Sequence, residues 1–523
     1  MNTVGMRLVE GLHARGVEVV FGIPGVHTVE MYRGLSGSPV RHVTARHEQG
    51  CAFMADGYAR ATGKPGVALV ITGPGLTNAL TAMAQAREDS VPMLVISGVN
   101  RRASLGKGWG LLHELPDQQA MVATLCPTRR ITAPDQVAET LDWAFATMAT
   151  GRPGPVHIEV PTDVMPMECP ALPAPTPPLP RVAASGLDRA AALLNATEKL
   201  VILAGGGTRG QEAALRALAE RLDAPVVQTI NARGQMHGHP LTVPASPSLS
   251  SVRRLIHDAD RVLAIGTEFG WTDYDMYVVG DLPARPDMIR IDACAEQLAR
   301  LPAALTLQGD AGATMAALLP LLAPHKGDGA ARADETRSKA RAEIGQLEPQ
   351  MPQRLEMVEV IRAALPGCLI VGDSTQPIYA GNLYYDHDRP GGWFNAASGY
   401  GALGYGPGAA VGAAVGTPGV KVVCLVGDGG LQFSPGELRT AVDERLPITF
   451  LVWNNAAYNE IADAMRAANT EVIGCHPSPL KMEPFAAACD LPFTSVPLDP
   501  EALHWALAQP QDGPRLIEVR VTA

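Results

Sequence analysis

Two polar residues, Asp428 and Asn455, have the types and the spacing that could hold a metal ion. Asp428 lies in a GDGG motif directly after the apolar run 422–426, and Asn455 completes an Asn-Asn pair directly after a second apolar run, 448–453. Short apolar runs bounded by glycine are typical of buried strands, and the ends of parallel strands form the ligand-binding edge of an open sheet. A carboxylate, an amide and a nearby carbonyl oxygen suit Mg²⁺, which often accompanies phosphates. The stretch therefore predicts a site for a diphosphate and its magnesium ion.

Either motif alone would be weak evidence, because GDGG is a common turn sequence and an Asn-Asn pair more often lies in a loop. Here the two motifs stand 27 positions apart (Asp428 to Asn455), at equivalent ends of consecutive strand candidates. Between them, Ser434 is a candidate helix N-cap, with Pro435 in the first turn and Glu437 at the capping-box position. The segment is therefore predicted to be a strand–helix–strand unit.

The composition fits a large α/β protein and excludes several classes of function. A chain of 523 residues is too long for one core and predicts two to four domains. The net charge of −11 argues against nucleic acid or an anionic membrane as a partner, and no apolar run approaches the roughly 20 residues of a membrane span. Eight cysteines without a CxxC pair, and an N-terminus unlike a secretory signal, favour reduced thiols in a cytoplasmic protein without zinc.

The chain divides into three blocks that each alternate helix and strand signals. We expect domains at residues 1–165, 185–325 and 350–523. The proline-dense run 166–180 predicts a first linker, and the charged run 325–350 predicts a second, partly helical one. Strand candidates with little polar interruption are typical of parallel sheets that are covered on both faces. The predicted fold class is α/β, with three doubly wound parallel sheets in series.

The motifs together resemble those of thiamine-diphosphate enzymes, a family whose cofactor motif also begins with GDG and ends with NN. The resemblance implies that Asp428, Asn455 and the carbonyl of Ala457 bind Mg²⁺. The segment RHEQGCAFMADGYARATGKPGVALVITGPGLTN is similar to the pyrimidine-binding half of these enzymes. Glu48 in this segment would hydrogen-bond the N1′ nitrogen of the aminopyrimidine, so that the protein tunes the carbanion chemistry of the cofactor. Taken alone, a glutamate among charged neighbours is more typical of a surface or helix-capping position.

The same resemblance supplies the other candidate cofactor-binding residues. They are Gly25, Thr72 and Asn78 in the first block and Ser374, Thr375, Gln376, Gly401, Leu403, Gly427, Asp428, Gly429, Gly430, Asn455 and Tyr458 in the third. Leu403 takes the position of a bulky apolar residue, commonly Met, that wedges between the cofactor rings. Thr72 stands near the position where certain decarboxylases carry a histidine, which disfavours that subgroup.

Two further groups of residues could contact the substrate. His113 lies in a loop where acetolactate synthases have a glutamine that faces the cofactor; it could transfer a proton or be an ordinary surface residue. The segment 268–275, with three carboxylates and three aromatic residues, could be an exposed acidic loop or a pocket for a cationic substrate tail. The candidate substrate residues are Glu268, Asp273, Asp275 and, after the Asn-Asn pair, Glu460.

The middle block could be read as a nucleotide-binding domain because it contains three consecutive glycines, 205–207, after a strand candidate. This cluster lacks the full GxGxxG spacing and is weak evidence. Acetolactate synthases, which bind FAD, typically have an Arg-Phe-Asp-Asp stretch in this domain, and here the residues at 268–271 are EFGW. We therefore expect thiamine diphosphate and Mg²⁺ as cofactors and no FAD.

The reaction implied by the resemblance is the decarboxylation of a small 2-oxo acid. The segments FGIPGVHTVEMYRGL and NRRASLGKGWGLLHELPDQ look most like those of 5-guanidino-2-oxopentanoate decarboxylases. The alternative is an acetolactate-synthase-like carboligase. A nicotinamide-dependent dehydrogenase would leave Asp428 and Asn455 unexplained, and a non-catalytic relative is disfavoured because Glu48 is present as well. In this family the halves of the cofactor site meet across a subunit interface, so we expect a homodimer or homotetramer.

Overall fold

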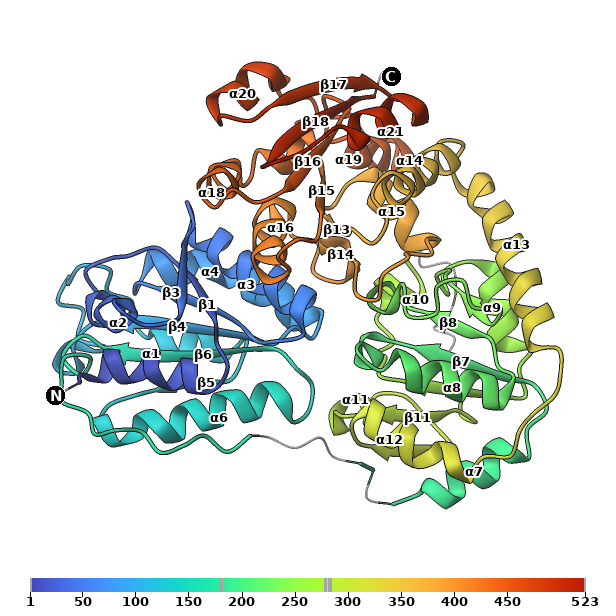
Figure 1. Cartoon of the computed structure of the whole chain (residues 1–523), viewed down its shortest axis with the longest axis horizontal. Helices are drawn as coiled ribbons and strands as arrows, with labels where there is room; N and C mark the ends of the chain where they lie inside the picture. Colours follow the sequence, from blue (N-terminus) through green and yellow to red (C-terminus); the bar gives the residue numbers. More distant parts are fainter. Residues whose placement is uncertain (1, 178–181, 184, 277–279, 281–284, 522–523) are drawn as a thin grey trace.

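The computed structural model describes residues 2–177, 182–183, 185–276, 280 and 285–521. Three six-stranded parallel sheets follow one another along the chain, which confirms the predicted α/β class (Figure 1). The end of the predicted first linker, 178–180, and the chain end, 522–523, lie outside the described residues.

The first sheet has the strand order β2-β1-β3-β4-β6-β5. Its strands are β1 (Val19–Gly22), β2 (Arg41–Thr44), β3 (Gly66–Val70), β4 (Met93–Val99), β5 (Thr128–Arg130) and β6 (Pro155–Pro161). The helices of this domain are α1 (Val4–Ala14), α2 (Val29–Leu35), α3 (Glu48–Thr62), α4 (Pro74–Glu88), α5 (Gln118–Ala123) and α6 (Val137–Ala149). The central strands β3, β4 and β6 are buried along their whole length, as expected for a sheet covered on both faces.

The second sheet has the order β12-β11-β10-β7-β8-β9. Its strands are β7 (Leu200–Ala204), β8 (Val226–Gln228), β9 (Thr242–Val243), β10 (Arg261–Ile265), β11 (Ile289–Asp292) and β12 (Leu305–Gln308). The accompanying helices are α7 (Leu187–Asn195), α8 (Glu212–Leu222), α9 (Ser250–His257), α10 (Trp271–Tyr274), α11 (Ala295–Ala299) and α12 (Ala311–Leu318).

The third sheet has the order β14-β13-β15-β16-β18-β17. Its strands are β13 (Leu369–Gly372), β14 (Trp393–Asn395), β15 (Val422–Gly427), β16 (Ile448–Asn454), β17 (Phe493–Pro497) and β18 (Arg515–Arg520). The helices are α14 (Met351–Ala364), α15 (Gln376–Leu383), α16 (Tyr405–Gly416), α17 (Asp428–Leu431), α18 (Glu437–Asp443), α19 (Asn459–Ala467), α20 (Met482–Ala488) and α21 (Pro500–Ala508).

The helix predicted between β15 and β16 begins later than its capping signal indicates. Its first residue is Glu437, with Gly436 at the N-cap, and a short separate helix, α17, precedes it. The Ser434 hydroxyl instead donates a hydrogen bond to the carbonyl of Gly404, 2.7 Å away. The capping-box prediction for Ser434 is therefore wrong, because a tertiary contact takes its side chain.

The charged run between the second and third domains forms helix α13 (Gly329–Leu347). Figure 1 shows this helix along the outer edge of the molecule, from the middle domain to the third domain. Ala333, Ala340 and Ile344 lie on its buried face. The segment is therefore mostly a helix with one face packed against the protein, whereas the sequence predicts a partly helical linker.

Helices α3 and α16 pack closely and bind the first domain to the third. At Gly57, a Cβ atom would lie 1.9 Å from the carbonyl oxygen of Ala409, and at Gly412 it would lie 1.8 Å from that of Met54. One hydrophobic core extends across this contact, and a second core is shared by the middle and third domains. The third domain therefore packs against both of the others.

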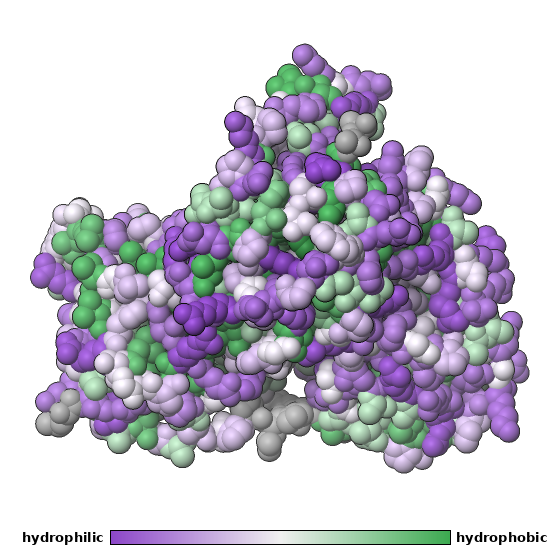
Figure 2. Space-filling view, turned by 45° about the horizontal axis from the view of Figure 1, so that its top comes forward, coloured by the Kyte–Doolittle hydropathy of each residue, from purple (hydrophilic) through white to green (hydrophobic). Residues whose placement is uncertain are grey.

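Figure 2 shows hydrophilic residues over most of one face, with smaller hydrophobic patches among them. Within the described ranges, no helix is both long and apolar enough to cross a membrane. All eight cysteines are buried and none forms a disulfide.

Candidate active site

The edge of the third sheet brings together three of the predicted residues, Asp428, Asn455 and Gln376. Strands β15 and β16 run parallel, with Gly427 opposite Trp453, so the residues that follow them are neighbours. The carboxylate of Asp428 accepts the backbone N–H of Asn455 at 3.3 Å, and the Asn455 amide donates to Oε1 of Gln376 at 3.3 Å. These contacts join the ends of three elements, β15, β16 and the start of α15.

The donor atoms at this edge fit a small, hard cation. Asp428 is 6% exposed, and burial raises the pKa of its carboxyl. A cation bound beside this carboxyl would lower that pKa and favour the charged form. Oδ1 of Asn455 lies 3.2 Å from the backbone nitrogen of Ala457, in a turn where Ala456 has a φ of 55°. The described residues hold no group of three His, Cys, Asp or Glu side chains that could bind a metal. A metal here would depend on one carboxylate with amide and carbonyl oxygens, a set suited to Mg²⁺.

The glycines around Asp428 leave room for the backbone and for neighbouring side chains. A Cβ at Gly429 would lie 2.5 Å from the ring of Tyr458, and one at Gly427 would lie 3.2 Å from Oγ1 of Thr375. Tyr458 and Thr375 therefore lie against the glycine stretch, as the sequence predicts for a shared site. A diphosphate could approach the backbone closely there.

The loop that carries Leu403 is held by a residue that sequence reasoning missed, Asp373. Its carboxylate accepts the N–H of Ser374 at 2.8 Å and that of Gly406 at 2.9 Å. Asp373 is fully buried, which raises its pKa to about 6. It thus joins the predicted Ser374 loop to the 401–406 segment. An aspartate directly after a buried strand was the available signal.

The edge of the first sheet carries Glu48 and Asn78. Glu48 is the first residue of α3, and its Oε2 accepts a hydrogen bond from the Asn78 amide at 3.0 Å. Asn78 lies in the first turns of α4, so two helix starts converge on this carboxylate. Gly25 packs against Ile71 in the same domain, where a Cβ would lie 2.4 Å from that side chain.

The hydroxyl of Thr72 is used inside the protein. Thr72 is 1% exposed and donates to Oε1 of Gln118 at 2.8 Å, which also accepts the N–H of Gly73 at 3.2 Å. The Gln118 amide donates in turn to Glu159, Ser97 and the carbonyl of Gly98. The Thr72 side chain is therefore buried and hydrogen-bonded within the first domain. Gln118, the first residue of α5, gave no sequence signal for this role.

His113 lies beside a second histidine, His27, that sequence reasoning did not single out. Their ring centroids are 5.2 Å apart, and Nδ1 of each ring is buried with no hydrogen-bond partner in the described parts of the chain. His113 has a φ of 60°, and its carbonyl packs against Gly73. Burial, and to a lesser extent His113, lower the pKa of His27. The available sequence signal for His27 was its position two residues after Gly25, a predicted cofactor-binding residue.

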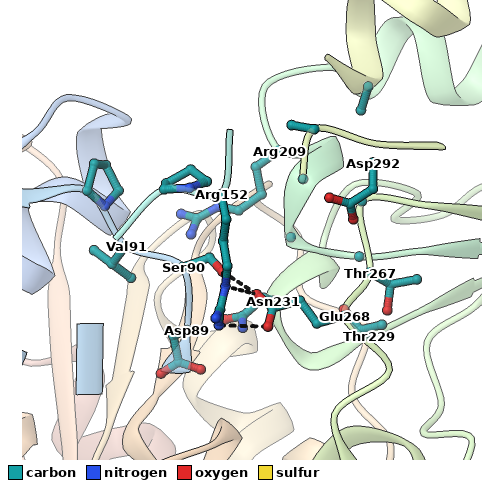
Figure 3. Close-up of a pocket in the computed structure, with 18 of the residues that line it drawn as sticks. Asp89, Ser90, Val91, Arg152, Arg209, Thr229, Asn231, Thr267, Glu268 and Asp292 are labelled. Carbon is teal, nitrogen blue, oxygen red and sulfur yellow. Dashed lines mark hydrogen bonds and ion pairs between the residues drawn. The ribbon is translucent and has the colours of Figure 1, made fainter. Parts of the chain in front are cut away.

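The acidic segment 268–275 lies elsewhere, between the first and middle domains. Glu268 and Asp273 line a cavity of about 1090 Å³ whose lining includes neither Glu48 nor Asp428. Figure 3 shows Glu268 joined to Arg152, at 2.7 Å, across this cavity. Burial raises the pKa of Asp273 to about 6.

The carboxylates of the acidic segment are also engaged within the chain. Asp273 accepts the N–H of Ile230 at 3.1 Å, and Asp275 is 1% exposed and pairs with Arg253 at 2.6 Å. The structure thus gives these carboxylates, like Glu268, protein partners. The cavity that Glu268 and Asp273 line includes neither Asn78 nor Asn455.

Glu460 does lie at the edge of the third sheet. It is the second residue of α19, which starts shortly after the Asn-Asn pair. Gln376, which accepts from Asn455, also hydrogen-bonds the Glu460 carboxylate. Glu460 is therefore the predicted substrate residue that the structure connects to the candidate metal ligands.

The chain presents two half-sites. In the described residues, no hydrogen bond joins Glu48 or Asn78 to Asp428, Asn455 or Gln376. One half-site belongs to the first sheet and the other to the third. Each half-site contains side chains that the resemblance predicts for one part of the cofactor, the aminopyrimidine in the first domain and the diphosphate in the third.

Comparison with known proteins agrees with this division. Models for thiamine pyrophosphate enzymes match the chain at residues 2–121 (N-terminal TPP binding domain), 187–318 (central domain) and 373–519 (C-terminal TPP binding domain). The chain belongs to the thiamine pyrophosphate (thiamine diphosphate) enzyme family, as the motifs predicted.

The chain is similar over most of its length to enzymes with stated reactions. A probable 2-ketoarginine decarboxylase of Pseudomonas aeruginosa, AruI, is 42% identical over 485 residues, covering 91% of this chain and 86% of that protein. The large subunit of acetolactate synthase isozyme 1 of Escherichia coli is 27% identical over 539 residues, 99% of this chain and 93% of that protein. The acetolactate synthase large subunit of Corynebacterium glutamicum is 33% identical over 481 residues, which cover 86% of this chain and 74% of that protein.

Proposed function

We propose that this protein is a thiamine-diphosphate- and Mg²⁺-dependent decarboxylase of 2-oxo acids, with 5-guanidino-2-oxopentanoate (2-ketoarginine) as its preferred substrate. The observation that carries the proposal is the Asp428–Asn455–Gln376 cluster at the edge of the third sheet, which has the donor atoms of a magnesium site. When bound, the cofactor supplies the carbon nucleophile and the electron sink for decarboxylation.

The residues of the chain have distinct proposed roles. Asp428, Asn455 and the Ala457 carbonyl would hold Mg²⁺. Glu48 would hold a proton at N1′ of the aminopyrimidine, and the 3.0 Å hydrogen bond from Asn78 fixes the orientation of its carboxyl. His113 would transfer protons to or from the reacting groups, since an imidazole ring can both accept and donate a proton.

Glu460 is the residue that we propose for the guanidinium of the substrate. A carboxylate pairs well with the planar guanidinium group, and Gln376 connects Glu460 to the candidate metal site. Glu268 and Asp275 already pair with Arg152 and Arg253. The similarity to the probable 2-ketoarginine decarboxylase of Pseudomonas aeruginosa supports this substrate class.

The second candidate function is carboligation of the acetolactate-synthase type, which the similarity to two acetolactate synthases favours. We propose no flavin for either reaction in this chain. The cavity beside the glycines 205–207 contains the Arg152–Glu268 ion pair and the Arg209 side chain. The absorbance spectrum of the purified protein is expected to lack the flavin bands.

We also propose that a second copy of the chain completes each site. Large apolar residues are exposed beside both half-sites: Val26 beside Gly25, Leu112 beside His113, Phe433 after α17 and Ile461 beside Glu460 in helix α19. Their exposed fractions range from 53% to 70%, which is typical of a surface that another protein covers. At least a homodimer is expected, and a tetramer would be two such dimers.

The test is release of CO₂ from a panel of 2-oxo acids, with product analysis, in the presence of thiamine diphosphate and Mg²⁺. The panel contains 5-guanidino-2-oxopentanoate, pyruvate, benzoylformate and a branched-chain oxo acid. Preference for the guanidino acid with an aldehyde product supports the proposal, and conversion of pyruvate to acetolactate supports the carboligase. Glu48→Gln should lower turnover by at least about 100-fold, whereas unchanged turnover would remove the mechanism.

A further inference from the structure

Glu437 of the third domain reaches into the turn that carries Glu48. It is the first residue of α18 and is 1% exposed. Its Oε1 accepts the backbone N–H of Arg46 and that of His47, each at 3.1 Å, and its Oε2 lies 3.3 Å from the Arg46 nitrogen. These two N–H groups directly precede Glu48, the first residue of α3. One carboxylate thus holds the turn from another domain.

The surroundings of Glu437 are built around this contact. A Cβ at Gly50 would lie 2.1 Å from Oε1 of Glu437, so only glycine leaves the carboxylate in place. The Thr440 hydroxyl donates to Oε2 at 2.9 Å. Burial raises the pKa of Glu437, and the hydrogen bonds from Thr440, Arg46 and His47 oppose that rise. A buried carboxylate that accepts several hydrogen bonds has a fixed orientation, so it can hold the turn in one position.

We propose that Glu437 is a positioning residue for Glu48, which it serves by fixing the turn 46–47 from the neighbouring domain. This inference rests on the proposed function, because it assigns Glu437 to the reaction through Glu48. The Glu48 carboxyl must meet one nitrogen of the cofactor, and small displacements of a catalytic group reduce rates strongly. Asn78 orients the end of the side chain, and Glu437 fixes its backbone.

The contact also connects the two half-sites within one chain. Glu437 follows Asp428 by nine positions, in the segment that leads from β15 through α17 to α18. The segment that begins at Asp428, a candidate magnesium ligand, therefore ends at Glu437, which holds the turn before Glu48. In the proposed dimer these half-sites belong to two different active sites.

The chain offers matched controls on the same helix. Asp443 pairs with the Arg46 side chain and Glu444 with that of Arg41, across the same domain boundary. Asp443→Asn and Glu444→Gln each remove a carboxylate at this boundary without touching the N–H groups of the turn. Glu437→Met removes both oxygens that accept those N–H groups and keeps the length of the side chain.

The first measurement uses the full-length protein without cofactor. Hydrogen exchange of a peptide covering residues 44–50 reports whether the turn has lost its acceptor. Exchange is expected to be at least about 10-fold faster in Glu437→Met and unchanged in the two controls. Equal exchange in Glu437→Met and the wild type would overturn the proposal.

The second measurement is a double-mutant cycle with Glu48→Gln, followed by the rate of deuterium exchange at C2 of bound thiamine diphosphate. Glu437→Met should slow this exchange by about 10-fold or more in the wild-type background and by less than about 2-fold in Glu48→Gln, because the two residues act as one unit. Equal losses in both backgrounds would show a general structural role and overturn the proposal.

The cycle separates this inference from the proposed function. If Glu48→Gln exchanges like the wild type, the proposed function fails. If Glu48→Gln is impaired and Glu437→Met behaves like the controls, only the inference about Glu437 fails. If Glu437→Met does not fold, Glu437→Asp serves instead, because it keeps the charge and shortens the reach by one methylene. That variant is expected to show the same pattern with smaller losses.

Discussion

His27 and His113 lie beside each other at the edge of the first sheet, with their ring planes tilted by 43°, and each has a buried Nδ1 without a protein partner in the described residues. A charge on His113 opposes a charge on His27, so the protonation of His27 depends on its neighbour. This arrangement suits a pair that passes a proton to a ligand. The sequence had indicated His113 alone.

For His113→Asn we expect kcat to fall by about 100-fold, the usual effect of losing an acid–base group. His27 should then titrate at a higher pH, because His113 is one of the two causes that lower its pKa. The histidine Cε1–H resonances, followed against pH, report this shift.

The control is His257→Asn, since the His257 side chain is 88% exposed and lies outside both half-sites. It should leave both kcat and the His27 titration unchanged. A His27 pKa that does not move in His113→Asn would show that the two rings are not coupled.

At the scale of the elements, the approach of α3 to α16 depends on the absence of a side chain at Gly412. A Cβ there would lie 1.8 Å from the carbonyl of Met54. Gly412→Ala is therefore expected to destabilise the protein by about 1–3 kcal/mol, as overpacking does. Gly345→Ala is the matched helical control, because its Cβ would meet Pro352 at an ordinary 3.4 Å. That variant should be neutral or slightly more stable, and equal melting temperatures for the two variants would contradict the prediction.

Strand β6 carries a buried histidine that makes stability depend on pH. His157 is fully buried between the hydroxyls of Ser97 and Thr128, each at 2.8 Å. Burial, and then the charge of Arg130, lower its pKa to about 3. Between pH 6.5 and about 3 the unfolded chain therefore binds a proton that the folded chain does not, and stability falls as the pH falls.

The loss is about 1.4 kcal/mol per pH unit below 6.5, or roughly 2 kcal/mol at pH 5. His157→Gln should reduce the fall in melting temperature between pH 7 and pH 5. The exposed His257→Gln should keep the wild-type profile. If the melting profiles of His157→Gln and the wild type run parallel, His157 does not cause the acid sensitivity.

The sequence predicted the elements and motifs whose signals are local. The strands before Asp428 and Asn455, the helix after Glu48 and the three-sheet architecture all follow from short apolar runs and adjacent motifs. What it missed depends on partners distant in the chain: Gln118 lies 46 residues from Thr72, and Glu437 lies 391 residues from Arg46. The error at Ser434 has the same origin, because a local capping signal gave way to a contact with Gly404.

At the scale of the whole molecule, the three domains meet at the buried side chain of Arg60. It donates to Asp56 and to Asp89, at 2.6 Å each, and to Asn231 of the middle domain at 3.3 Å. Tyr405 of the third domain donates to the same Asp56 carboxylate at 2.6 Å. A buried charge is tolerated only when it is paired in this way. This network, with the two shared cores, fixes the domains relative to one another.

If a second copy completes each site, two inactive variants should restore activity when they are combined. In a mixed dimer of Glu48→Gln and Asp428→Asn, one site carries both substitutions and the other carries neither. Random mixing makes half of the dimers mixed, with one of two sites intact, so about a quarter of the wild-type activity is expected. The measurement is CO₂ release after the two variants are co-expressed or are dissociated and reassociated together. Each variant treated in the same way alone is the control. If the mixture has no more activity than its components, Glu48 and Asp428 serve a site within one chain, and the contact through Glu437 would then join two parts of one active site.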